Sequence, residues 1–216
     1  MRHEAAEALG AIGDSSVCGI LEKYSSDPSQ EVAETCQISL ERIRWSQTKD
    51  EGTFVDNNPY QSVDPAPPMM NGSISEWQHQ LTDTTLPLFL RYRAMFALRN
   101  HGGRDAILAL VSGFKDSSAL FKHELAYILG QMQDESAIAG LRERLDDVTE
   151  NAMVRHECAE ALGSIATDEC FKILQQYLKD GERVVRESCE VALDMYEHEK
   201  SGAFQYANTA SKVTQT

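Results

Sequence analysis

The sequence has 216 residues, of which 42% are hydrophobic, 25% charged and 7% aromatic, and its formal net charge is −14. This length allows one domain, or two small lobes, with a hydrophobic core. The acidic charge argues against nucleic acid as a partner, because phosphate binding calls for a basic face, and it favours a basic protein or a cationic group. No apolar run approaches the roughly 18 residues that a membrane span requires.

The cysteines and the first residues bear on the cellular compartment. The five cysteines are odd in number and lie within helical patterns, so we expect reduced thiols and no disulfide framework. The amino-terminal residues lack the apolar stretch of a signal peptide. We therefore expect a cytoplasmic protein that contacts neither membrane nor nucleic acid.

Apolar residues recur at three- and four-residue spacing along most of the chain, which predicts helices. The main runs are 5–12, 32–43, 92–98, 125–132, 158–165 and 185–195. Shorter helices are predicted at 15–24, 104–113, 136–145 and 170–178. The main runs share a leucine in the same phase, at Leu9, Leu40, Leu98, Leu129, Leu162 and Leu193. Four of the five steps between these leucines are 31 or 33 residues, which predicts an all-α solenoid of two-helix repeats.

One step of 58 residues interrupts this period and divides the chain. Residues 47–76 hold most of the prolines and show no apolar period, so we interpret them as a linker. Residues 1–46 are then a partial amino-terminal half, residues 77–200 a carboxy-terminal half of four repeats, and residues 201–216 a flexible tail. A shift of 153 residues superimposes the segment after Arg2 on that after Arg155, so the halves are pseudo-symmetric.

The two halves have unequal numbers of repeats. The amino-terminal half has repeats at Leu9 and Leu40 only, and the helix expected before the first of them is missing. We therefore expect a truncation, a short isoform or an incomplete gene model, with a further His-Glu pair about 33 residues before His3 in a complete protein. The alternative is a half that evolved shorter.

A His-Glu dipeptide recurs in register with the repeats. The pairs are His3-Glu4, His123-Glu124 and His156-Glu157, and each follows a basic residue. Other repeats carry Glu34, Tyr92 and Glu187 at the position of the histidine, so the repeat itself does not require the pair. A single pair would be explained by helix capping and the helix dipole. Three pairs in register indicate a shared chemical role.

Metal binding is the chemistry that best fits these pairs. His123 and His156 lie one repeat apart, on helices expected to pack side by side. Two imidazoles and one neighbouring carboxylate form a facial ligand set with open positions, which favours iron or manganese over structural zinc. His198-Glu199 lies out of register near a helix end and is not expected to bind metal. A non-catalytic protein-binding scaffold and a mononuclear metal protein remain alternatives.

Several segments resemble the deoxyhypusine hydroxylase family. They include the two RHE(A/C)AEALG segments, VDPAP, LFLRYRAMFALRN, KHELAYILGQ and ERVVRESCEVALDMYEHE, and the resemblance covers essentially the whole chain. It implies a HEAT-like solenoid and a non-haem di-iron monooxygenase. It also implies dioxygen as co-substrate and the precursor of translation initiation factor 5A, which carries deoxyhypusine, as partner.

The resemblance also implies roles for individual residues. His123, His156 and Glu157 correspond to the complete ligand set of one Fe(II) ion. His3 and Glu4 correspond to two of the three ligands of a second Fe(II) ion. Glu124 corresponds to a carboxylate that binds the substrate amine, and no further catalytic residue is implied. Because the first of the family's four His-Glu pairs is absent, we expect little hydroxylase activity from this chain alone.

Overall fold

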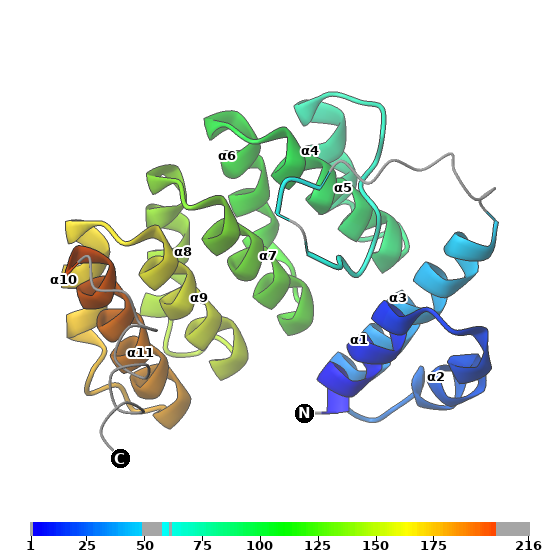
Figure 1. Ribbon diagram of the computed structural model, residues 1–216, viewed down its shortest axis with the longest axis horizontal. Helices are drawn as coiled ribbons and strands as arrows, with labels where there is room; N and C mark the ends of the chain where they lie inside the picture. The colour runs from blue at the N-terminus through cyan, green and yellow to red at the C-terminus, as the bar shows by residue number, and fades with distance from the viewer. Residues whose placement is uncertain (1, 49–57, 61, 202–216) are drawn as a thin grey trace, which may run out of the picture.

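The computed structural model describes residues 2–48, 58–60 and 62–201, and for 198–201 the backbone alone. The described residues form an arc of α-helices with no β-strand among them (Figure 1). This confirms the all-α repeat fold that the periodicity predicts. The linker predicted at 47–76 and the tail at 201–216 lie partly outside the described residues.

Helices alternate between two layers of the arc. The long inner helices are α1 (Arg2–Ile12), α3 (Gln30–Gln47), α5 (Leu88–His101), α7 (Ala119–Met132), α9 (Ala152–Ile165) and α11 (Arg183–Ser201). The shorter helices are α2 (Cys18–Tyr24), α4 (Ile74–Thr82), α6 (Arg104–Ser112), α8 (Ile138–Asp146) and α10 (Asp168–Gln176). In Figure 1, α7 and α9 face α1 and α3 across the opening of the arc. None of the described helices is long and apolar enough to cross a membrane.

The Leu-Gly step of the repeats marks where neighbouring inner helices approach most closely. A Cβ atom on Gly130 would lie 2.9 Å from the Cα of Ala161, and one on Gly163 would lie 2.6 Å from the Cβ of Ala192. Contacts below 3.0 Å are repulsive, so a larger residue would push the helices apart. Glycine at this phase therefore allows α7, α9 and α11 to stack closely.

The basic residue before each histidine has a structural explanation. Arg155 donates to both carboxylate oxygens of Asp180, at 3.0 and 2.6 Å, and to the carbonyl oxygen of Leu145. Asp180 in turn accepts from the backbone N–H of Glu182, just before α11. The ion pair thus joins the start of one inner helix to the loop that leads into the next.

The same link recurs along the solenoid. Its members are Arg2–Asp27, Arg91–Asp116, Lys122–Glu150 and Arg155–Asp180. In the last three pairs both side chains are largely buried. The recurring Arg or Lys therefore has a structural role in these ion pairs, in which the His-Glu dipeptide takes no part.

The predicted linker ends earlier than its composition suggests. Helix α4 begins at Ile74, inside the 47–76 range. Ser73 and Glu76 form a capping box, in which each side chain satisfies the other residue's backbone N–H. The capping box is a helix-start signal that the Ser-Ile-Ser-Glu sequence already contains.

We expect the buried Arg155–Asp180 pair to contribute more to the free energy of unfolding than an exposed ion pair does. Arg155→Met should reduce the free energy of unfolding by about 3 kcal/mol, because Asp180 would keep a buried charge without its partner. Urea denaturation followed by circular dichroism measures this change. Arg183→Met, which breaks the exposed Arg183–Glu187 pair, is the matched control and should shift the midpoint little. Equal shifts for the two variants would contradict the structural role of Arg155.

Candidate metal centre

Two neighbouring inner helices bring three potential metal ligands together. His123 lies on α7, and His156 and Glu157 lie on α9; one ligand atom from each falls within 4.8 Å of the others. The imidazole rings are 5.6 Å apart between centroids, and Nε2 of His123 lies 3.0 Å from a carboxylate oxygen of Glu157. Two nitrogens and one carboxylate on adjacent parallel helices match the two-histidine, one-carboxylate set expected from the sequence. It is the one such three-ligand group among the described residues.

A fourth side chain, which sequence reasoning missed, supports His156 from behind. Nδ1 of His156 lies 3.3 Å from Oε1 of Glu160, and the same oxygen accepts a 2.8 Å hydrogen bond from the hydroxyl of Ser188. A carboxylate on the second imidazole nitrogen is the usual outer partner of a metal-binding histidine. A sequence signal existed, because Glu160 and Glu7 occupy the same place in the two RHE(A/C)AE segments.

The amino-terminal pair faces the same opening from α1. Nε2 of His3 lies 3.3 Å from Oε1 of Glu4, and no third ligand joins them in the part of the chain that the structure describes. Burial lowers the pKa of His3, while the charge of Glu4 acts to raise it and that of His123 to lower it. This influence of His123 indicates that the two sets of ligands approach each other across the opening.

Glu124 does not join the three-ligand group and lines a cavity between the halves instead. It lines a small cavity of about 20 Å³ together with Glu7 and Tyr92. Burial raises the pKa of Glu124 to about 8, and the negative charges of Glu7, Asp64 and Glu157 act in the same direction. Burial also raises the pKa of Glu7, with a further contribution from Glu4. The cavity between the halves is thus a place where negative charge is crowded and poorly solvated.

His79 and His101 lie apart from this cluster. His79 and His101 are exposed on α4 and α5. The side chains of His198 and Glu199 lie outside the described residues. On α9, the hydrogen bond that His156 donates to Glu160 raises the pKa of His156, and the same bond lowers the pKa of Glu160.

The buried carboxyl of Glu124 predicts a pH-dependent stability in metal-free protein. Its folded pKa lies above its unfolded value of 4.5, so the folded state binds more protons between pH 4.5 and about 8. Stability should therefore fall as pH rises through this window. Glu124→Gln should reduce that fall by roughly 5 kcal/mol, from 1.36 kcal/mol per pKa unit between 4.5 and about 8.

Urea denaturation at several pH values measures this difference. Glu143→Gln removes an exposed carboxylate and is the matched control; it should leave the pH profile of the wild type unchanged. A Glu124→Gln profile parallel to that of the wild type would contradict the raised pKa.

Comparison with known proteins agrees with the fold. Residues 107–194 match the HEAT repeat family, and residues 1–27 and 90–116 match the PBS lyase HEAT-like repeat. The chain is 60% identical to deoxyhypusine hydroxylase of Danio rerio over 213 residues, which are 96% of this chain and 69% of that protein. It is 58% identical to the Homo sapiens enzyme, covering 96% of this chain and 68% of that protein.

A solved structure of human deoxyhypusine hydroxylase, in complex with glycerol, superimposes with a TM-score of 0.86 at 58% identity. The match covers 91% of this chain and 67% of that one. With this identity, coverage and shared architecture, the chain belongs to the deoxyhypusine hydroxylase family, a family of monooxygenase oxidoreductases.

Proposed function

We propose that this protein acts in the hydroxylation of deoxyhypusine on the precursor of translation initiation factor 5A, in the cytoplasm, with non-haem iron and dioxygen. The observation that carries the proposal is the cluster of His123, His156 and Glu157 in a chain of this family. Neither a packed core nor a protein-binding surface requires two imidazoles and a carboxylate in mutual contact.

The residues present fit an Fe(II) ion. Borderline nitrogen donors and one hard oxygen donor, without a thiolate, favour Fe(II) or Mn(II) over a structural zinc ion. All five cysteines are free, and four of them are buried. The ion, when bound, would supply the activation of dioxygen and the electron transfer that the chain's own side chains cannot provide. The chain would supply the ligands, and Glu160 would hold the ring of His156 in place.

We propose that Glu124 holds the cationic end of the substrate side chain. Deoxyhypusine is a lysine extended by an aminobutyl group, so it presents an ammonium group. An ammonium group near Glu124 and Glu7 would lower their raised pKa values and be attracted by the carboxylates that form. Holding the amine would fix the carbon to be hydroxylated relative to the metal ligands, which is the main contribution that positioning makes to such a reaction.

The second Fe(II) ion of the family would lie at His3 and Glu4. In the described residues this set has two members, whereas the set on α7 and α9 has three. We therefore propose one complete and one incomplete iron site, with weak or no hydroxylation by this chain alone. A mononuclear metal protein is the second candidate, because one three-ligand group is complete within the described structure.

Removal of one ligand tests the metal centre directly. His156→Ala should reduce bound iron to below about one tenth of the wild-type value in protein reconstituted with Fe(II) without oxygen and then desalted, because two ligands hold the ion poorly. Iron per chain is measured by emission spectroscopy. His79→Ala, at an exposed histidine on α4, is the control and should bind as much iron as the wild type. A wild type that purifies and reconstitutes without iron would favour a scaffold.

Activity and iron content together separate the two candidates. We expect about one tightly bound iron per chain, and hydroxylation of the deoxyhypusine-bearing precursor that is slow or undetectable by mass spectrometry. Full turnover by the 216-residue chain would contradict the proposal that its second site is incomplete. Binding of the precursor with one iron and no turnover would agree with it, whereas failure to bind the precursor would favour the mononuclear alternative.

A further inference from the structure

A groove runs from the candidate metal centre along the surface between α7 and α9. It has a volume of about 390 Å³, in the range of ordinary ligand sites. We name it the flanking groove, and it is lined by Tyr60, Tyr127, Gly130, Gln131, Gln133, Glu157, Glu160, Ala161 and Ser164. Glu157, a member of the three-ligand cluster, stands at one end of it. The groove is therefore continuous with the candidate site but extends well beyond the ligands.

Small residues line the floor of the groove and larger residues line its walls. Gly130, Ala161 and Ser164 are small residues at a place where α7 and α9 approach closely. Larger phenol and amide groups stand around them, from Tyr60, Tyr127, Gln131 and Gln133. A trough with a small-residue floor has room for a main chain, and phenol and amide groups can exchange hydrogen bonds with its peptide groups.

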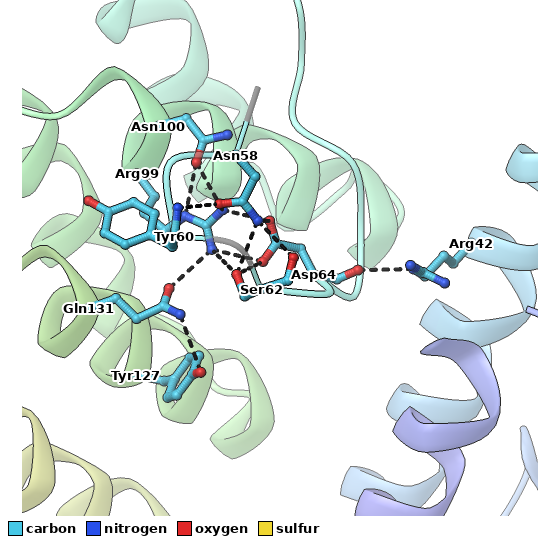
Figure 2. Close-up of polar contacts among 9 residues, drawn as sticks. All are labelled: Arg42, Asn58, Tyr60, Ser62, Asp64, Arg99, Asn100, Tyr127 and Gln131. Atoms are coloured by element: carbon cyan, nitrogen blue, oxygen red, sulfur yellow. Dashed lines mark hydrogen bonds and ion pairs between the residues drawn. The ribbon is translucent and has the colours of Figure 1, made fainter. Parts of the chain in front are cut away.

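One wall of the groove is built from the linker and is held in place by a buried arginine. Arg99 on α5 is 1% exposed and donates to both carboxylate oxygens of Asp64, at 2.8 and 2.6 Å, and to the side chain of Asn58 at 3.0 Å. Its guanidinium group also lies over the ring of Tyr60, 4.8 Å from the centroid (Figure 2). The buried guanidinium group of Arg99 is held by several hydrogen bonds, and it contacts the ring of Tyr60. Tyr60 is therefore fixed beside the groove.

The opposite wall is connected to the same network. Arg99 donates to Oε1 of Gln131 at 3.0 Å, and Nε2 of Gln131 donates to the hydroxyl of Tyr127 at 3.2 Å (Figure 2). Because the Tyr127 oxygen accepts this bond, its own O–H proton is directed elsewhere. A phenol is protonated at neutral pH, so Tyr127 can also donate a hydrogen bond. Although oriented in this way, Tyr127 remains 45% exposed.

We propose that the flanking groove binds the main chain of the substrate protein on one side of the modified lysine, with Tyr127 and Tyr60 as its principal contacts. The inference rests on the proposed function and deepens it, because it separates recognition of the protein from recognition of the amine at Glu124. Continuity with Glu157 places an occupant of the groove next to the reacting side chain. An exposed but oriented tyrosine is the residue type that most often dominates protein contacts.

Binding of two probes to the iron-loaded protein under nitrogen tests the proposal. The probes are the deoxyhypusine-bearing precursor protein and free deoxyhypusine, each titrated by calorimetry. Tyr127→Ala should weaken binding of the precursor about 10-fold, which is typical for loss of a central aromatic contact, and change binding of free deoxyhypusine less than about twofold. Tyr60→Ala tests the other wall independently and should show the same pattern. Iron content should match that of the wild type in both variants.

Tyr24→Ala is the matched control, because Tyr24 is a partly exposed tyrosine on α2, away from the flanking groove. It should bind both probes as the wild type does. Unchanged binding of the precursor by both groove variants would overturn the inference, and so would an equal loss for the two probes. If the wild type bound neither probe, the proposed function would fail and the inference with it, which distinguishes the two failures.

Discussion

The buried ion pair at the start of the inner helices is the contact on which the rest of the site depends. Arg155 and its counterparts bind a carboxylate in the loop before the next inner helix, and they do so at every His-Glu repeat. The histidine is the next residue along the helix, so its direction follows from that of its basic neighbour. Lys122 is held by Glu150 and Arg155 by Asp180, each in the loop before the next inner helix. The side chains of His123 and His156 then point toward each other.

Close stacking of α7 and α9 brings the side chains of His123 and His156 near each other. Glycine at the Leu-Gly step removes the side chain that would otherwise hold α7 and α9 apart. The imidazoles of His123 and His156 then approach to 5.6 Å between centroids, and Glu157 reaches His123. Burial, and after it the negative charge of neighbouring carboxylates, raises the pKa of Glu124 and of Glu7 beside this cluster. A divalent cation and an ammonium group are the ligands that would relieve this crowding.

The linker contributes to the site and does more than connect the two halves. Asp64 binds Arg99 through its carboxylate, while its carbonyl oxygen accepts a hydrogen bond from Arg42 on α3, at 2.9 Å (Figure 2). Glu34 on α3 also accepts a 2.7 Å hydrogen bond from Ser118, which caps α7. These contacts fix α3 relative to α5 and α7. They therefore set how α1, with His3 and Glu4, faces the cluster of His123, His156 and Glu157.

The sequence by itself determined the repeat, its phase and the three His-Glu pairs, because helical periodicity and exact register are local properties of the chain. It could not show that Glu160 supports His156, since that contact depends on side-chain directions and on Ser188 from the next repeat. The sequence could not predict the partners of Arg99 either, because Asp64 and Asn58 lie in a segment without periodicity. Only the tertiary structure decided these contacts, and only it separated Glu157, which joins His123 and His156, from Glu124, which lines the cavity between the halves. Distances of this kind arise from packing between helices.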